Sequence, residues 1–204
     1  MLKYFICLIS LIFVVTPLTS STIIDYTINT KNNNEINIIE YRDSVKTQLI
    51  NEVDTYINTI APSSKLDGEI VVDMCCEYNV DIAFVLAQGQ IESHFGTAGT
   101  ARKTNSVFNV GAYDGYSASK QRANGFDFSH PNESVEPYLI LLTNNYLVNG
   151  KTINDLMVSY INYLGMRYAS DTRYEYMLRS VYNKINSKTN INSLYNEYIN
   201  SLKS

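Results

Sequence analysis

The sequence has no tryptophan, and only two histidines and three cysteines among its 204 residues. His94 and His130 stand alone, and neither a Cys-x-x-Cys nor a His-Glu-x-x-His spacing occurs, so a zinc amidase or protease lacks its ligands. Cys7 lies in the N-terminal apolar run, whereas Cys75 and Cys76 are adjacent, a spacing that does not easily form a disulfide. We expect the adjacent pair to be small buried hydrophobic residues rather than a nucleophile.

Positive charge is also scarce. The chain has 16 Lys and Arg against 20 Asp and Glu, which gives a formal net charge of −4. Nucleic acids and anionic membrane surfaces attract a basic face, so we expect neither as a partner of the mature protein. Because no glycine-rich phosphate loop and no metal-ligand spacing occurs, we expect no metal and no organic cofactor. The hydrophobic share of 45% is ordinary for a globular protein, and we expect a monomer.

The N-terminus has the pattern of an export signal. A short positive start (residues 1–3) precedes an apolar run (residues 4–15) and a stretch of small residues (16–21). The run is shorter than the roughly 18 to 20 residues that span a bilayer. We therefore predict a signal peptide over residues 1–21, with an uncleaved anchor as the alternative. The protein would then act outside the cell or in the periplasm, at the cell wall.

The remaining chain is predicted to be mainly helical, with a small loop-and-strand lobe (an α+β arrangement). Residues 22–62 read as a polar linker (22–37) followed by an amphipathic helix, residues 63–188 as the catalytic domain, and 189–204 as a C-terminal helix or tail. Helical spacing, caps and breakers predict domain helices over 66–78, 82–93, 134–142, 152–163 and 171–185. Residues 95–129 are rich in Gly, Ser and Thr and form the expected lobe, with a candidate strand at 106–110.

Glu92 is the polar residue that stands out. It lies in the last turn of the predicted helix 82–93, which is apolar almost all round and therefore belongs in the middle of a domain. Partial burial raises the pKa of a carboxyl group, as a general acid requires near neutral pH. The alternative is a solvated glutamate at a fraying helix end, and position alone does not choose between the two.

Four ordered segments bear on this choice. Residues 86–96 (LAQGQIESHFG) resemble the Leu-Ala-Gln-x-x-x-Glu-Ser-x-x-Gly signature of glycoside hydrolase family 73, the peptidoglycan glucosaminidases. Residues 105–110 (NSVFNV) are similar to its Asn-Asn-Leu-Phe-Gly-Ile run. Residues 128–138 are similar to its Phe-x-x-x-x-x-x-Ser-x-x-x-Tyr segment, with one residue fewer between Phe128 and Ser134. Residues 168–174 (YASDTRY) are similar to its Tyr-Ala-Thr-Asp-Pro-x-Tyr motif. The likeness covers roughly residues 66–186.

The resemblance implies a lysozyme-like fold with a sugar-binding groove between a helical lobe and a small β-lobe. Glu92 would protonate the glycosidic oxygen, and Tyr168 would lie close to it and orient the substrate or an intermediate. A tyrosine packed under the groove is the alternative for Tyr168. Substrate-binding residues are expected among Gln88, Ser93, Phe108, Asn109, Tyr113 and Tyr163.

The sequence departs from the family in its second carboxylate. Many members have a catalytic Glu on a Thr-Glu strand, but residues 117–122 contain no acid. Asp114, Asp127 and Glu133 are candidates; Asp114 is favoured, because Glu133 suits the first turn of a helix. Alternatively, the acetamido group of the substrate acts as an internal nucleophile, or the enzyme is a lytic transglycosylase.

The sequence thus predicts an exported hydrolase that binds the glycan strands of peptidoglycan and cleaves β-1,4 bonds at N-acetylglucosamine. A muramidase or lytic transglycosylase is the alternative within enzymes. The missing acid leaves a further alternative, a non-catalytic wall-binding or structural protein of a phage or secretion machine.

Overall fold

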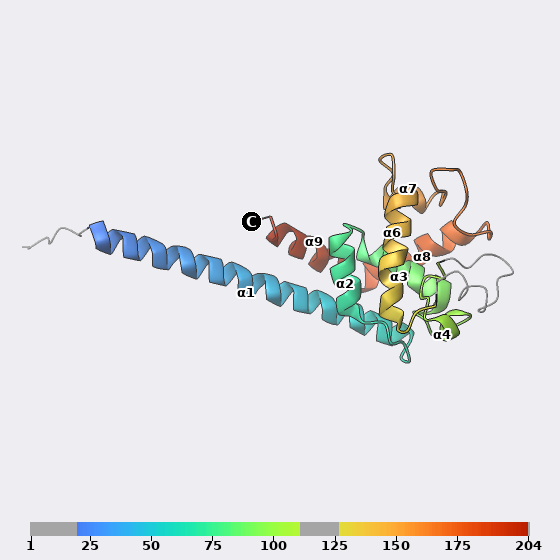
Figure 1. Ribbon diagram of the computed structural model, residues 1–204, viewed down its shortest axis with the longest axis horizontal. Helices are drawn as coiled ribbons and strands as arrows, with labels where there is room; N and C mark the ends of the chain where they lie inside the picture. Colours follow the sequence, from blue (N-terminus) through green and yellow to red (C-terminus); the bar gives the residue numbers. More distant parts are fainter. Residues whose placement is uncertain (1–19, 111–126, 204) are drawn as a thin grey trace, which may run out of the picture. The chain divides into compact units, whose positions relative to one another are not determined.

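The computed structural model describes residues 20–110 and 127–203, with side chains described from residue 35 onward (Figure 1). The chain divides into two units, Met1–Glu40 and Tyr41–Ser204. The described residues of the first unit are helical and belong to α1 (Ser20–Ile60), whose later part belongs to the second unit. Within these described ranges, no helix is long and apolar enough to cross a membrane.

Residues 22–37 were expected to form a polar linker without regular structure. They are instead helical and form part of α1. The segment is polar and shows no apolar periodicity, but it also contains neither glycine nor proline, the residues that most strongly interrupt a helix. The predicted signal peptide lies outside the described residues, except for its last two positions, which are helical.

The second unit is built from helices and loops. They are α2 (Gly68–Glu77), α3 (Ile82–Ser93), α4 (Ala101–Thr104), the 3-10 turn η1 (Pro131–Ser134), α6 (Val135–Asn145), α7 (Ile153–Leu156), α8 (Tyr174–Lys188) and α9 (Ile191–Ser201). The described residues contain no strand, only an isolated antiparallel bridge between Ile161 and Arg167. The predicted mainly helical class is confirmed.

The candidate strand at 106–110 is wrong. Its residues form turns, and Asn105 and Asn109 have positive φ angles of 52° and 49°. Asparagine tolerates this left-handed conformation better than most residues, which suits a turn and not a strand. The other part of the predicted lobe, residues 111–126, lies outside the described residues.

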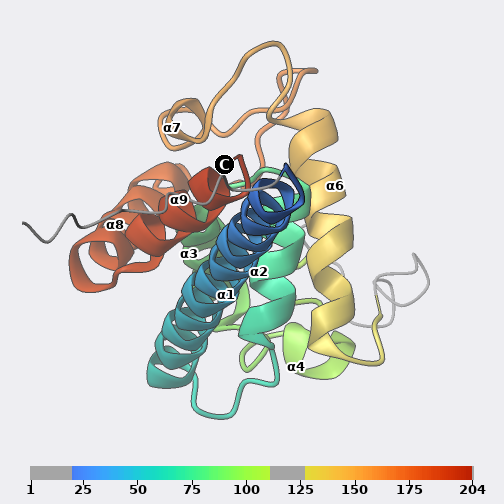
Figure 2. The same ribbon diagram turned by 90° about the vertical axis from the view of Figure 1, so that its left-hand side faces the viewer.

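Helix α3 lies at the centre of the unit, packed against α2, α8 and α9 (Figures 1 and 2). Every residue from Ile82 to Gly89 is buried, as the apolar pattern predicts. Asp81 caps the helix by accepting a hydrogen bond from the Phe84 N–H at 2.9 Å. The helix ends where His94 adopts φ 48°, which leaves Glu92 in the last turn.

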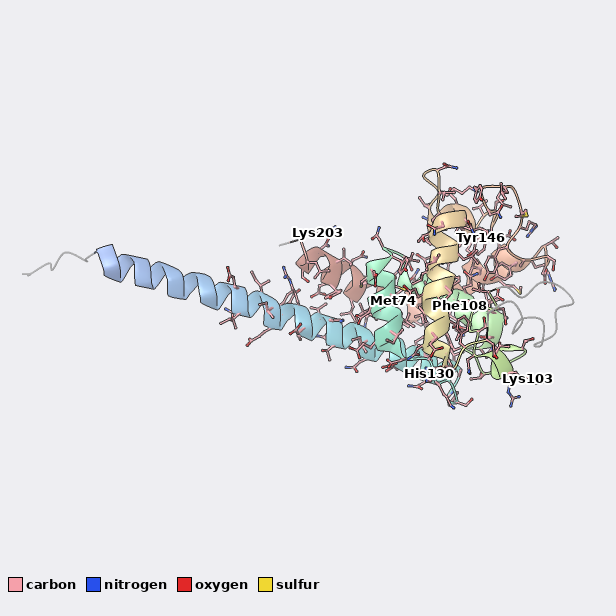
Figure 3. The ribbon with its side chains drawn as sticks, in the orientation of Figure 1. Met74, Lys103, Phe108, His130, Tyr146 and Lys203 are labelled. Carbon is pink, nitrogen blue, oxygen red and sulfur yellow. The ribbon has the colours of Figure 1, made fainter. Side chains whose placement is uncertain are left out.

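Two aromatic rings pack on the end of α3 at a glycine. A Cβ atom at Gly89 would lie 3.2 Å from the Phe95 ring and 3.3 Å from the Phe108 ring, so glycine lets both rings approach the helix. Phe108, which is labelled in Figure 3, is also stacked on a ring of α6. The partner is Tyr138, with ring centroids 3.9 Å apart. This packing fixes the residue after Phe108 beside the helix end.

The predicted helix 152–163 is much shorter than expected. Thr152 and Asp155 form the predicted capping box, yet α7 ends at Leu156. The chain then enters a tight loop (residues 160–168, the 160–168 loop), where the Asn162 side chain accepts hydrogen bonds from the backbone N–H groups of Leu164 and Met166. Such side-chain bonds compete with helix formation, and here they hold residues 162–166 in the loop and out of the predicted helix.

Candidate active site

Glu92 is partly buried, and both of its carboxylate oxygens have partners. The Tyr174 hydroxyl, from the first residue of α8, donates to Oε1 at 2.5 Å. The Asn109 side-chain amide donates to Oε2 at 3.3 Å and to the Glu92 backbone carbonyl at 2.8 Å. Residues far apart in the sequence therefore hold the carboxyl group in one orientation.

Burial raises the pKa of Glu92 above its ordinary value. The hydrogen bonds from Tyr174 and Asn109 act in the opposite direction, because they stabilise the ionised form, but burial has the larger effect. A carboxyl group with a raised pKa keeps its proton closer to neutral pH, so Glu92 is suited to act as a general acid. The alternative of a fully solvated glutamate does not fit this environment.

Asn109 has a second feature that matters for the site. Its left-handed backbone turns the side chain towards Glu92. Its Oδ1 atom is buried and has no hydrogen-bond partner among the described residues. Asn109 was predicted to bind substrate, and in the structure its amide contacts the acid directly.

Four tyrosines pack together beside the acid. Tyr160 and Tyr168 are stacked, with centroids 4.5 Å apart, and Tyr174 lies 5.7 Å from Tyr168. Tyr146 meets the rings of Tyr160 and Tyr168 edge-on, at 5.0 and 5.6 Å. Burial raises the pKa of Tyr168 and Tyr174 well above the ordinary range, so their hydroxyl groups remain proton donors.

The tyrosine that contacts the acid is Tyr174, whereas the sequence favours Tyr168. The Tyr168 hydroxyl donates to the Phe108 backbone carbonyl at 3.1 Å, and its ring packs between its neighbours. Tyr168 thus makes no hydrogen bond to Glu92 in the structure. It packs against Tyr174, which does. Both tyrosines belong to the motif at residues 168–174, so the motif correctly indicates that a tyrosine lies near the acid. Its spacing does not tell which of the two hydroxyl groups reaches Glu92.

Three predicted substrate-binding residues are instead part of the core. Gln88 is fully buried, and its Oε1 accepts hydrogen bonds from the hydroxyls of Tyr138 and Tyr160 at 2.5 and 2.9 Å. Ser93 is buried and donates to the Val107 carbonyl at 2.6 Å. Phe108 is buried against Tyr138. None of the three has the exposed surface that direct contact with a sugar requires.

The other predicted residues are scattered. Tyr163 is 56% exposed in the 160–168 loop, as a sugar-contacting residue can be. Tyr113 and Asp114 lie outside the described residues. Asp127 is exposed, and Glu133 accepts hydrogen bonds from the Ser129 N–H and hydroxyl, which lower its pKa.

In the part of the chain that the structure describes, no second carboxylate contacts Glu92. Glu175 follows Tyr174 in the chain, but Arg167 engages it in an ion pair at 2.7 Å. The described residues also contain no group of three His, Cys, Asp or Glu side chains that could hold a metal ion.

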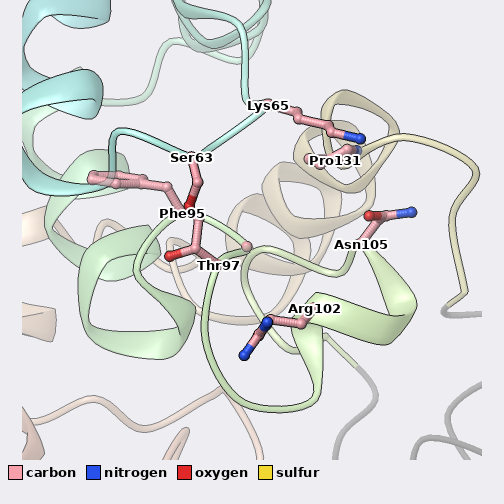
Figure 4. Close-up of a pocket in the computed structure, with 8 residues that line it drawn as sticks. Ser63, Lys65, Phe95, Thr97, Arg102, Asn105 and Pro131 are labelled. Carbon is pink, nitrogen blue, oxygen red and sulfur yellow. The ribbon is translucent and has the colours of Figure 1, made fainter.

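A polar pocket of about 270 Å³ lies beyond the end of α3 (Figure 4). Its lining residues come from the loops after α1 and α3, from α4 and from η1: Ser63, Lys65, Phe95, Gly96, Thr97, Arg102, Asn105 and Pro131. Glu92 is not among them, so this pocket is not where a bond next to the acid would be cleaved.

A carboxyl group of raised pKa at the end of the central buried helix suits a glycosidase, whose reaction needs a carboxylic acid to protonate the leaving oxygen. The chain belongs to the glucosaminidase family, because residues 68–187 match the family described as mannosyl-glycoprotein endo-beta-N-acetylglucosaminidase. The resemblance to glycoside hydrolase family 73 is confirmed, and the substrate is a glycan. A search of curated proteins found no match.

We expect the Tyr174→Phe variant to raise the pKa of Glu92 further, because it removes a hydrogen bond that stabilises the ionised carboxylate. The ¹³C NMR titration of glutamate side-chain carboxyls measures this shift, with the Glu92 signal assigned by its absence in Glu92→Gln. Tyr176→Phe is the control, since Tyr176 lies on the same helix and is 73% exposed. An unchanged Glu92 titration in Tyr174→Phe would contradict the assignment.

Proposed function

We propose that the protein is an exported peptidoglycan hydrolase that cleaves β-1,4 bonds at N-acetylglucosamine, with Glu92 as general acid. One observation carries the proposal. In a glucosaminidase-family domain, Glu92 is partly buried, has a raised pKa and is held by Tyr174 and Asn109. The family supplies the glycan substrate, and the leader-like N-terminus supports action at the cell wall.

The chemistry follows from the placement of the proton. The Glu92 carboxyl transfers its proton to the glycosidic oxygen while the bond between that oxygen and the sugar C1 breaks. The leaving sugar departs as an alcohol, and positive charge develops on the ring that remains. Glu92 is then a carboxylate, and the hydrogen bonds from Tyr174 and Asn109 stabilise that charge.

We expect Glu92→Gln to lower the rate of wall degradation by about 10² or more, the scale of general acid catalysis. Turbidity loss of purified peptidoglycan measures the rate. Mass spectrometry of the products identifies the reducing-end sugar, which separates a glucosaminidase from a muramidase or a lytic transglycosylase with its 1,6-anhydro product. Near-normal turnover in a folded Glu92→Gln protein would remove Glu92 from the mechanism.

The same variant has an expected stability signature. Because the folded-state pKa of Glu92 is raised, the unfolded chain releases its proton first, and the wild type loses stability as pH rises through the interval between the two pKa values. Glu92→Gln lacks this loss, so it should gain stability relative to wild type towards neutral pH in urea unfolding. Glu136→Gln is the control, because it makes the same substitution at an exposed glutamate on α6.

The second carboxylate separates two mechanisms. We propose Asp114 as the base that activates water, in which case the carboxyls stand about 6.5 to 9.5 Å apart and the product is inverted. Asp114→Asn should then lower activity as strongly as Glu92→Gln. ¹H NMR of the fresh product gives its anomeric configuration. A retained product with undiminished Asp114→Asn turnover would favour the acetamido group instead.

Export is a separate expectation. We propose that residues 1–21 are removed, because a short apolar run follows a positive start and precedes small residues. N-terminal sequencing of protein from the culture medium or periplasm should give a start near residue 22. A mature chain that begins at Met1 and sediments with membranes would show an uncleaved anchor.

A further inference from the structure

We propose that the ion pair between Arg167 and Glu175 positions the catalytic acid, by closing a ring of contacts that begins and ends at Glu92. The inference rests on the proposed role of Glu92. Among the described residues, no hydrogen bond or ion pair joins Arg167 or Glu175 to Glu92, so they are positioning residues and not catalytic ones.

The ion pair of Arg167 and Glu175, called the clamp below, joins the 160–168 loop to α8. One Arg167 terminal nitrogen donates to both carboxylate oxygens of Glu175, at 2.9 and 2.7 Å. Glu175 also accepts the Tyr160 backbone N–H at 3.1 Å and is 9% exposed. Arg167 reaches further, to the backbone carbonyls of Ala169 and Asp171. Glu175 therefore ties both sides of the 160–168 loop to the first turn of α8.

The 160–168 loop is held closed at the same place. Ile161 and Arg167 form the antiparallel bridge, and the Tyr168 N–H donates to the Tyr160 carbonyl at 2.8 Å. Tyr160 in turn bonds Gln88 in the middle of α3 through its hydroxyl. The loop base is thus fixed to both the central helix and α8.

Chain neighbours link these contacts into a ring. Tyr174, which holds Glu92 Oε1, directly precedes Glu175. Arg167 directly precedes Tyr168, whose hydroxyl bonds the Phe108 carbonyl. Phe108 directly precedes Asn109, which holds Glu92 Oε2. The acid is therefore gripped from two sides by residues that the ion pair ties together.

Only one partner of this pair is buried: the Glu175 side chain is 11% exposed, whereas 41% of the Arg167 side chain is exposed. Removing the Glu175 carboxylate from water costs free energy that its attraction to Arg167 offsets, so the pair is weak support for stability and better explained by positioning. The same segment contains a comparison: Arg173 and Asp171 pair at 3.1 Å on the surface, with 78% of the Arg173 side chain exposed. An exposed pair of that kind contributes little to stability, because water screens the attraction between its charges.

Loosening the clamp should act on Glu92 through Tyr174. The Tyr174 hydroxyl and the Asn109 amide bond Glu92, and Tyr160 and Tyr168 lie close enough to interact with its charge. No charged side chain among the described residues shifts the pKa of Glu92. If Tyr174 moves away, Glu92 loses the larger of its two hydrogen-bond contributions and its pKa rises. The position of the proton relative to the glycosidic oxygen also becomes less defined.

The experiment compares Glu175→Gln and Arg167→Met with Arg173→Met, the matched control from the exposed pair. We expect both clamp variants to raise the pKa of Glu92 in the ¹³C NMR titration and to move the basic limb of the kcat profile to higher pH. Maximal kcat should fall about tenfold to a hundredfold, the effect of a displacement near 1 Å, with little change in KM. Arg167→Lys, which keeps the charge, should restore part of the loss.

A double variant tests whether the ion pair acts on Glu92 through Tyr174. Glu175→Gln combined with Tyr174→Phe should shift the Glu92 pKa no further than Tyr174→Phe alone, because both changes remove the same contact. Additive shifts, an unshifted Glu92 in both clamp variants, or an equal shift in Arg173→Met would overturn the proposal. Unfolding of both clamp variants would also overturn it, since the pair would then serve the whole fold.

The NMR titration keeps this proposal distinct from the proposed function. If Glu92→Gln is inactive but the clamp variants leave the Glu92 titration unchanged, the function stands and the clamp role fails. If Glu92→Gln keeps full activity while the clamp variants shift the titration, the ring exists and the catalytic assignment fails.

Discussion

The site depends on one carboxyl group, that of Glu92, which is partly buried at the end of the most apolar described helix, α3. Burying Glu92 disfavours its ionised form, and this raised pKa makes the group useful as an acid. The same burial requires partners for the polar atoms, because an unpaired buried polar group costs about 1–3 kcal/mol. Tyr174 and Asn109 meet that requirement, and their own placement depends in turn on the 160–168 loop and on the turn after Phe108.

A second polar group lies deeper in the same helix. Gln88, one turn before Glu92, accepts hydrogen bonds from Tyr138 of α6 and Tyr160 of the 160–168 loop. A buried amide with two specific partners ties these segments to the central helix in one register, which a purely apolar contact would do less selectively. The abundance of tyrosine in this chain therefore has a local use, because rings fill the core while hydroxyls satisfy buried oxygens.

Sequence reasoning was strongest where the pattern is local. The apolar run of α3, its Asp81 cap and the position of Glu92 all follow from residues close together in the chain, and the structure agrees. It failed where the outcome depends on distant contacts. Which of Tyr168 and Tyr174 reaches the acid depends on how the 160–168 loop closes. Gln88, Ser93 and Phe108 lie within the recognised motifs, but their side chains are buried in the core. The polar start of α1 and the early end of α7 went unpredicted, since neither is marked by apolar spacing.

Gly89 shows how the inside of the domain sets the dimensions of its surface. Because this position has no side chain, the rings of Phe95 and Phe108 lie against the backbone of α3, where a Cβ atom would come within 3.2 and 3.3 Å of them. Asn109 directly follows Phe108, so the position of the Phe108 ring against Gly89 also determines whether the Asn109 amide reaches Glu92. A larger residue in an exposed turn can often be accommodated. At Gly89 even a methyl group would push the Phe108 ring away from the helix, and with it the turn that carries Asn109.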